Sequence, residues 1–332
     1  MATYKSTKGF TVQVLADDPT VEDAAGLLYF NTTDNEFKYV IPGGISSATW
    51  SSGGAMNTAR GGAGSAVNGT QTAGLAFGGE GAGGNKTLTE AYNGSSWTEV
   101  NDMNTARGIL GGSGTQALAL AFAGNPGGGN TTDASEEYDG TSWAEGNNVN
   151  TARYGLKGSG IQTAALGFAG FASSARKVLT EKYDGTSWTE VNDLNTARTD
   201  PGGFGTTQSS SICAGGNTSP GNNYTVNSES FNGTSWTETN NLNVAKQSMG
   251  GAGSSTDGLV FGGSTGSLQA TTEAWNGTSW TEVGDLATAR QGLGGLGTGA
   301  LALAFAGNVP ANTAVTEEWV LPEVLIKVVS DS

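Results

Sequence analysis

The chain has no histidine and a single cysteine, Cys213, among its 332 residues. An internal disulfide is excluded because it requires two cysteines. The absence of histidine excludes Ser-His-Asp and Cys-His catalytic arrangements, which need an imidazole base. The composition therefore rules out hydrolases built on either arrangement.

Long apolar runs and positive charge are also lacking. No run approaches the ~18 residues of a membrane helix, and the N-terminus, MATYKSTKGFTVQV, has no apolar signal segment. We therefore expect a protein made in the cytoplasm without standard export. Only 15 Lys and Arg stand against 30 Asp and Glu, which gives a formal net charge of −15. This charge repels a phosphate backbone, so nucleic acid is not an expected partner, and it favours solubility.

Proline is scarce, with 7 residues, whereas glycine is abundant, with 55. Collagen is excluded because glycine follows no Gly-X-Y period. Disorder is not expected either, because 36% of the residues are hydrophobic and eight are tryptophan. Short apolar runs between glycine-rich turns predict an all-β chain.

A unit of about 45 residues recurs along the chain. Its markers are a tryptophan, a basic residue ten positions later, and a glutamate two positions before an aromatic residue. The tryptophans are Trp50, Trp97, Trp143, Trp188, Trp236 and Trp280; the basic residues are Arg60, Arg107, Arg153, Arg198, Lys246 and Arg290; and the glutamates are Glu90, Glu136, Glu181, Glu229, Glu273 and Glu317.

Each unit is predicted to form four strands. In one unit these are GILGGSG (108–114), ALALAFAG (117–124), SEEY (135–138) and the strand at Trp143. Asn-Gly or Asp-Gly separates the last two strands in five units, and this pair is a strong hairpin signal. Because a lone sheet of this size leaves its faces uncovered, the units must stack radially or linearly.

The ends of the repeat favour a ring. The strand at Glu317–Trp319 has no tryptophan strand after it, whereas SSATW (46–50) has no three strands before it. Six complete sheets result if the first tryptophan strand joins the last sheet. The prediction is a six-bladed β-propeller of four-stranded antiparallel blades over residues 46–319, closed by the N-terminal Trp50 strand joining the last blade.

The order of elements within the unit resembles the kelch motif. A glycine-rich strand is followed by an apolar strand ending in glycine, a glutamate before an aromatic residue, and a tryptophan before a basic residue. The spacer TEVNDLNTAR (189–198) departs from the motif, with Asn-Thr where kelch repeats often carry proline. The resemblance implies a kelch-like propeller. Kelch-fold oxidases of the galactose oxidase kind need histidine ligands for copper, which are absent here.

No catalytic residue, metal site or cofactor is predicted, and we do not expect an enzyme. Catalysis by a pair of carboxylates stays open in principle, because Asp and Glu are plentiful. The tryptophans are expected to pack between sheets, and Cys213, aligned with Phe77 and its counterparts, is expected to be a buried apolar residue. The repeated cations and glutamates are interpreted as structural ion pairs. The alternative is a ring of arginines that binds an anionic ligand.

Binding residues are expected in the variable loops between second and third strands, because loops vary while the scaffold repeats. The large side chains in these loops are candidates for partner binding, since aromatic and arginine residues dominate binding hot spots. The alternative is that these side chains belong to the turns and have no role in binding. These candidates are Phe171, Arg176, Lys177 and Tyr224.

The end segments, 1–45 and 320–332, lie outside the repeat. A β-hairpin is predicted around Thr32–Asn35, and both ends are expected to pair with other proteins, homo-oligomer partners included. The stretch AGLLYFNTTDNEFKYV (25–40) resembles an N-terminal element of tailed-bacteriophage virion proteins, Gly-x-Leu-Tyr-x-Asn-Thr.

That resemblance implies a virion appendage, either a fibre, a tail protein or a capsid-surface protein, assembled in the host cytoplasm. Its end segments would bind other virion proteins, and its propeller head would bind a neighbouring protein, a host receptor or a surface glycan. No membrane insertion is expected. The alternative is a bacterial extracellular lectin or adhesin.

Overall fold

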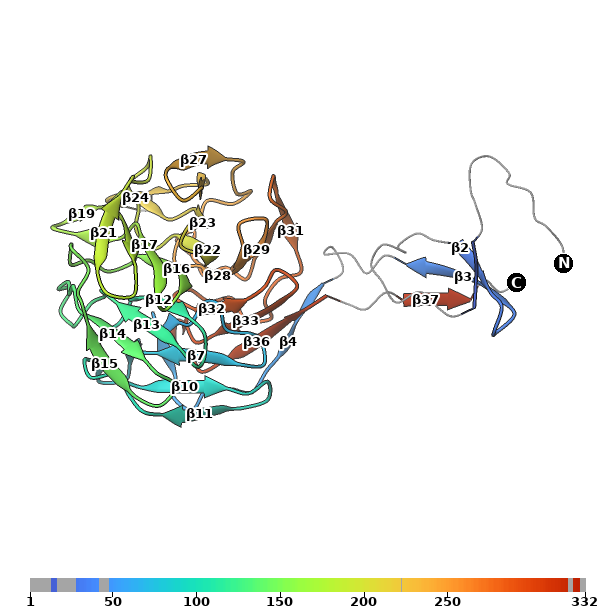
Figure 1. Ribbon diagram of the computed structural model, residues 1–332, viewed down its shortest axis with the longest axis horizontal. Coiled ribbons are helices and arrows are strands. Elements are labelled where there is room, and N and C mark those ends of the chain that lie inside the picture. The colour runs from blue at the N-terminus through green and yellow to red at the C-terminus, as the bar shows by residue number, and fades with distance from the viewer. Residues whose placement is uncertain (1–12, 17–27, 42–47, 222, 322–324, 329–332) are drawn as a thin grey trace. The chain divides into compact units, whose positions relative to one another are not determined.

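The computed structural model describes residues 13–16, 28–41, 48–221, 223–321 and 325–328. All regular structure among these residues is β-strand, and they contain no helix, as the sequence predicted. The chain divides into two compact units (Figure 1). The smaller comprises Met1–Thr49 with Leu321–Ser332, and the larger comprises Trp50–Val320.

The smaller unit contains one four-stranded sheet in the order β1-β2-β3-β37. The hairpin expected around Thr32–Asn35 is present, and the Asn31 side chain shapes its turn by accepting hydrogen bonds from the backbone of Thr33 and Asp34. Both end segments of the chain contribute to this sheet, because β37 pairs antiparallel with β3. The remainder of 1–45 lies outside the described residues. The strands are β1 (Gln13–Leu15), β2 (Leu28–Asn31), β3 (Glu36–Ile41) and β37 (Leu325–Val328).

The larger unit contains several four-stranded antiparallel sheets, in an arrangement consistent with a propeller. In order, from inner to outer strand, the first three are β6 (Gly64–Ser65), β7 (Gly74–Phe77), β10 (Thr89–Tyr92) and β11 (Trp97–Val100); β12 (Gly111–Gly114), β13 (Ala119–Phe122), β14 (Ser135–Tyr138) and β15 (Trp143–Gly146); and β16 (Lys157–Ile161), β17 (Ala164–Phe168), β20 (Thr180–Tyr183) and β21 (Trp188–Val191).

The sheets that follow have the same order, and the last takes its outer strand from the start of the repeat region. They are β22 (Gly202–Thr207), β23 (Ser210–Ala214), β26 (Ser228–Phe231) and β27 (Trp236–Thr239); β28 (Gly250–Ser254), β29 (Asp257–Phe261), β30 (Thr272–Trp275) and β31 (Trp280–Val283); and β32 (Gly294–Gly297), β33 (Leu301–Phe305), β36 (Thr316–Val320) and β4 (Thr49–Ser52).

Small sheets of two or three strands include several of the loops that were expected to vary. They are β18 (Phe171–Ala172) with β19 (Ala175–Arg176), β24 (Asn217–Ser219) with β25 (Asn223–Tyr224), β34 (Asn308–Val309) with β35 (Ala311–Asn312), and the three-stranded set β5 (Arg60–Gly61), β8 (Glu80–Gly81) and β9 (Gly84–Asn85).

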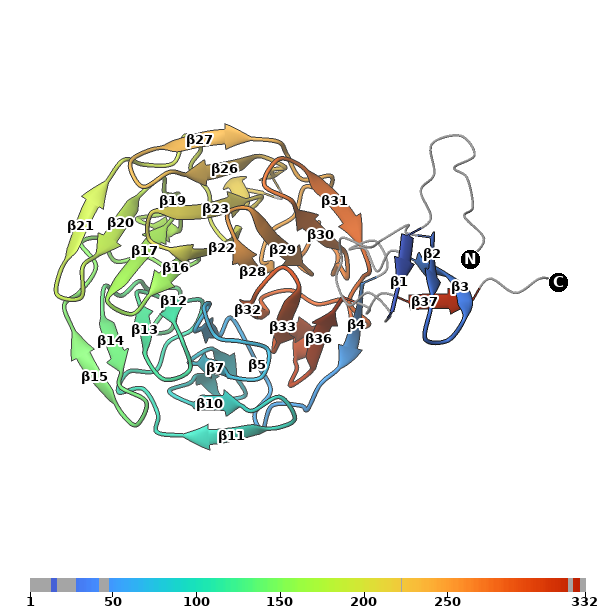
Figure 2. The same ribbon diagram turned by 45° about the vertical axis from the view of Figure 1, so that its right-hand side comes forward.

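The four-stranded sheets of the larger unit are arranged around a common centre (Figure 2). Next to that centre, one residue from each repeat donates its backbone N–H to the corresponding carbonyl of another repeat, at 2.7–3.0 Å. The six bonds form a closed cycle, called here the hub, and every hub residue has a positive φ between 51° and 67°. The hub residues are Gly62, Ile109, Gly155, Asp200, Ser248 and Gly292.

Glycine in the inner strands permits close packing against the phenylalanine of the next strand. A Cβ added to Gly111 would lie 2.3 Å from the Phe122 ring, and one added to Gly294 would lie 2.3 Å from the Phe305 ring. No real side chain tolerates such contacts, so these positions require glycine as long as the phenylalanine keeps its place.

The strand register corrects the alignment of Cys213. It faces Glu229, the position that Ala121 holds opposite Glu136, so Cys213 corresponds to small residues and not to phenylalanines. Ala214 stands at the phenylalanine position instead. Phe204 of the neighbouring strand supplies the missing ring and contacts Trp280, with centroids 6.1 Å apart. Cys213 is buried, as expected.

Candidate functional site

Each repeated cation lies beside the glutamate of its own repeat, and the side chains of both are buried. The nitrogen–oxygen distances are 3.3 Å for Arg60–Glu90, 3.1 Å for Arg107–Glu136, 2.6 Å for Arg198–Glu229 and 3.6 Å for Lys246–Glu273. Arg153–Glu181 and Arg290–Glu317 are also paired. None of these cations is exposed to a ligand, so the geometry matches structural ion pairs and not an anion-binding ring.

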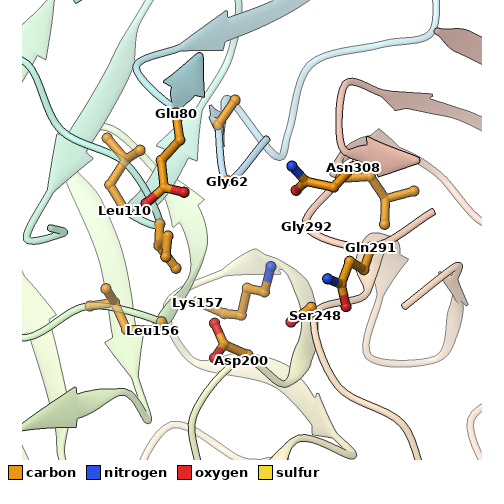
Figure 3. A pocket seen from close by; sticks show the side chains of 14 residues that line it. Gly62, Glu80, Leu110, Leu156, Lys157, Asp200, Ser248, Gln291, Gly292 and Asn308 are labelled. Carbon is orange, nitrogen blue, oxygen red and sulfur yellow. The ribbon is translucent and has the colours of Figure 1, made fainter. Parts of the chain in front are cut away.

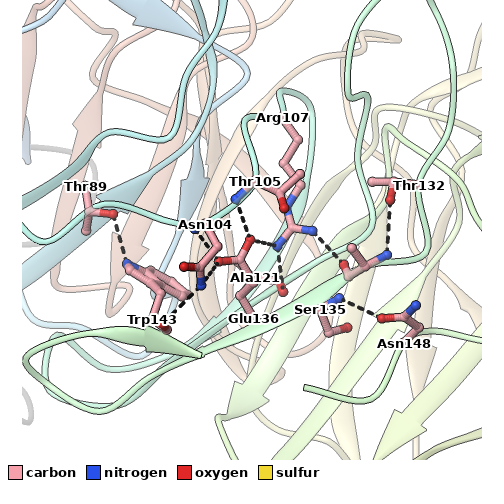
Figure 4. Close-up of polar contacts among 11 residues, drawn as sticks. Thr89, Asn104, Thr105, Arg107, Ala121, Thr132, Ser135, Glu136, Trp143 and Asn148 are labelled. Carbon is pink, nitrogen blue, oxygen red and sulfur yellow. Dashed lines mark hydrogen bonds and ion pairs between the residues drawn. The ribbon is translucent and has the colours of Figure 1, made fainter. Parts of the chain in front are cut away.

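The second repeat shows how such a buried carboxylate is satisfied (Figure 4). Glu136 accepts hydrogen bonds from Arg107, from the backbone and side chain of Asn104, and from the backbone of Thr105. Arg107 also donates to the carbonyl of Ala134 at 2.8 Å. Burial lowers the pKa of Arg107, whereas the charge of Glu136 raises it. The Asn-Thr of the spacer therefore anchors the glutamate in this repeat.

The tryptophans pack between neighbouring sheets. Trp143 contacts Phe77 of the preceding sheet, with centroids 5.0 Å apart, and Trp50 contacts Phe261 in the same way at 4.8 Å. Four indole N–H groups donate to a threonine hydroxyl of the preceding sheet at 2.9–3.0 Å, and they belong to Trp50, Trp97, Trp143 and Trp236. The Nε1 atoms of Trp188 and Trp280 are buried without a partner among the described residues. Serines, Ser135 and Ser228, stand at the corresponding positions, and their Oγ atoms are also buried without a partner.

The four candidate partner-binding residues come from two loops whose strands, β19 and β24, contact each other. Phe171 faces Arg176 across its hairpin, and the guanidinium lies 5.4 Å from the ring centroid. The backbone of Lys177 forms an isolated β-bridge with Arg198, and Tyr224 pairs with Asn217 in the second loop. All four are partly buried, so they are integrated into the loop structure more than the sequence suggested.

A cavity of about 230 Å³ lies against the hub (Figure 3). The side chains of Glu80, Lys157 and Asp200 are directed into it, with Ser248, Gln291 and Asn308 beside them. Leu110, Leu156 and Leu293 add apolar surface. Glu80, Gln291 and Asn308 are partly exposed, so the cavity reaches solvent.

The charged groups of the cavity influence one another. Burial raises the pKa of Asp200, which the charges of Lys157 and Arg176 lower in turn. Burial raises the pKa of Glu80 and lowers the pKa of Lys157. Lys157 Nζ also donates to the Met249 carbonyl at 3.2 Å. The sequence interpretation missed this cavity, because it compared the residues that the repeats share. When the repeats are aligned, a charged residue at a position where the other repeats have uncharged residues is the signal that could have revealed the cavity.

The part of the chain that the structure describes has no cluster of three or more His, Cys, Asp or Glu side chains placed to hold a metal ion. Among the same residues there is no helix with the length and hydrophobicity to span a bilayer. Comparison of the chain with protein-family models found no match. A search of curated proteins likewise found no matching sequence.

Proposed function

We propose that the larger unit is a six-bladed, kelch-like β-propeller closed by the Trp50 strand. Three observations support closure. β4 is the outer strand beside β36, the Gly53 N–H donates to the Thr316 carbonyl at 3.0 Å, and Trp50 contacts Phe261 as the other tryptophans contact the preceding sheet. The cyclic hydrogen bonding of the hub supports a count of six. In this arrangement the chain's first repeat strand latches its last sheet.

We propose further that the protein is a structural appendage of a tailed-phage virion, with a propeller head that binds a host-surface glycan or a protein. The observation that carries this proposal is the segment 25–40, with its Gly-x-Leu-Tyr-x-Asn-Thr element. In the described part of that element Tyr29 and Asn31 are buried, and Asn31 shapes the hairpin turn. The element thus has a physical role as a folded hairpin, which suits an attachment segment. The proposed role is binding and assembly, without catalysis.

The test of this role is the composition of purified particles. We expect mass spectrometry to find the chain in stoichiometric amounts in virions, and antibody labelling to place it on their surface. A chain that is absent from particles but present on bacterial cells would replace the virion role with that of a bacterial lectin or adhesin. For the head, we expect a fluorescent form of the protein to bind host cells, and periodate oxidation of cell-surface glycans to abolish that binding.

A further inference from the structure

Lys157, Asp200 and Glu80, the three charged residues that line the cavity against the hub, each differ from the residues at the same position in the other repeats. Lys157 pairs with Phe168 in the register where the other inner strands have Gly64, Gly111, Gly202, Gly250 and Gly294. Asp200 is the only charged member of the hub. Glu80 pairs with Gly61 at the position where the corresponding pairings place asparagine, serine or phenylalanine.

These interruptions are unfavourable for folding alone. Lys157 occupies a column where a Cβ would overlap the phenylalanine ring in several sheets. Asp200 has a φ of 54°, a conformation that costs a residue with a Cβ free energy that glycine does not lose. Departures from local rules that gather around one cavity are typical of a functional site. Here all three side chains enter the same volume (Figure 3).

The cavity also holds polar groups without protein partners. Within the described residues, the side chains of Glu80, Ser248 and Gln291 make no hydrogen bond. Polar groups in a concave site that lack partners are available to a ligand. Two carboxylates, Glu80 and Asp200, and one cation, Lys157, line the cavity, so its charge does not favour an anionic ligand.

We propose that this cavity binds a single uncharged sugar residue at the end of a surface glycan. The carboxylates accept from sugar hydroxyls, Lys157 and Gln291 donate to them, and the leucines cover the apolar face of the ring. A volume of about 230 Å³ is small for a ligand site, and it suits one sugar ring better than a chain. The excess of carboxylates over cations in the lining disfavours sialylated, uronic or phosphorylated sugars.

The inference rests on the proposed glycan-binding role and is tested with variants that restore the repeat. Lys157→Gly, Asp200→Gly and Glu80→Asn each install a residue that other repeats carry at the same position, so each is expected to fold. Glu99→Gln, on an exposed outer-strand residue, is the matched control for loss of one negative charge. The full chain and each variant are applied to an array of neutral, amino and acidic glycans. Affinities are then measured by titrating the best neutral monosaccharide.

We expect the wild-type chain to bind neutral glycans, and each cavity variant to bind about tenfold to a hundredfold more weakly, as for loss of a charged hydrogen bond. Glu99→Gln should bind like the wild type. Unchanged binding by all three variants, or a preference for acidic glycans, would overturn the assignment of the cavity while leaving glycan binding intact. No glycan binding by the wild type would overturn it too, and detection of the chain in virions would still decide the appendage role.

Discussion

Two tryptophans lack the hydrogen bond that their counterparts make, and this defect is repairable. Trp188 and Trp280 face Ser135 and Ser228, and all four polar side-chain atoms are buried without partners among the described residues. Where threonine stands at this position, its hydroxyl accepts from the indole, as Thr89 does from Trp143 at 3.0 Å. Threonine has fewer χ1 rotamers than serine and directs its hydroxyl more reproducibly.

We predict that Ser135→Thr and Ser228→Thr stabilise the protein. A hydrogen bond contributes about 1 kcal/mol net, and the two sites lie in different, non-adjacent sheets, so their effects should add to about 2 kcal/mol. The added methyl groups contribute more if they pack as in the other sheets, at ~0.8 kcal/mol for each buried carbon. The free energy of unfolding is measured by urea titration, where the midpoint should rise at unchanged slope.

The reverse changes serve as matched controls. Thr89→Ser and Thr180→Ser should each lose about 1 kcal/mol, since they recreate the serine geometry. If both serine-to-threonine variants were neutral or destabilised while the reverse variants lost nothing, the indole–hydroxyl bond would have no energetic role and the reasoning would be wrong.

Three further predictions follow from the same repeats. Ala287 replaces the asparagine that anchors the glutamate elsewhere, so Ala287→Asn should add bonds to Glu317 and stabilise the protein by about 0.5–1 kcal/mol in urea titration. Glu136→Gln should cost about 3–5 kcal/mol, because it leaves the buried charge of Arg107 uncompensated; a cost below that of an exposed Glu99→Gln would refute the structural role. Burial and a hydrogen bond to Glu318 raise the pKa of Tyr92 to about 12. The folded pKa lies above the unfolded value of ~10, so this contribution is complete below about pH 10 and is lost as pH rises toward 12. Tyr92→Phe should reduce the fall of the urea midpoint between about pH 10 and pH 12. A fall as steep as that of the wild type would contradict the assignment to Tyr92.

Much of the fold could be predicted, because it is repeated. The all-β class and the four-stranded antiparallel sheets are confirmed, since Asn-Gly and Asp-Gly turns and short apolar runs between glycine-rich turns signal them locally. The ion pair of Arg107 with Glu136 could also be predicted from the repeat, because two residues that recur at a similar spacing in every repeat are expected to make the same contact in each.

Features specific to one repeat escaped prediction. Lys157 and Asp200 come from different repeats, and only the arrangement of the sheets around a centre brings them to one cavity. Cys213 was misaligned because Phe204, on another strand, supplies the ring that Ala214 lacks. The pairing of β37 with β3 joins opposite ends of the chain, and no local pattern specifies such a partner.

The hub has a consequence for how this scaffold can change. Its bonds run from main chain to main chain, so glycine, serine, isoleucine and aspartate all occupy equivalent places without interrupting the cycle. Single substitutions in the hub alter the side chains presented to the cavity, while the main-chain bonds of the cycle stay in place. Recognition can therefore diversify one side chain at a time on a framework that need not be rebuilt.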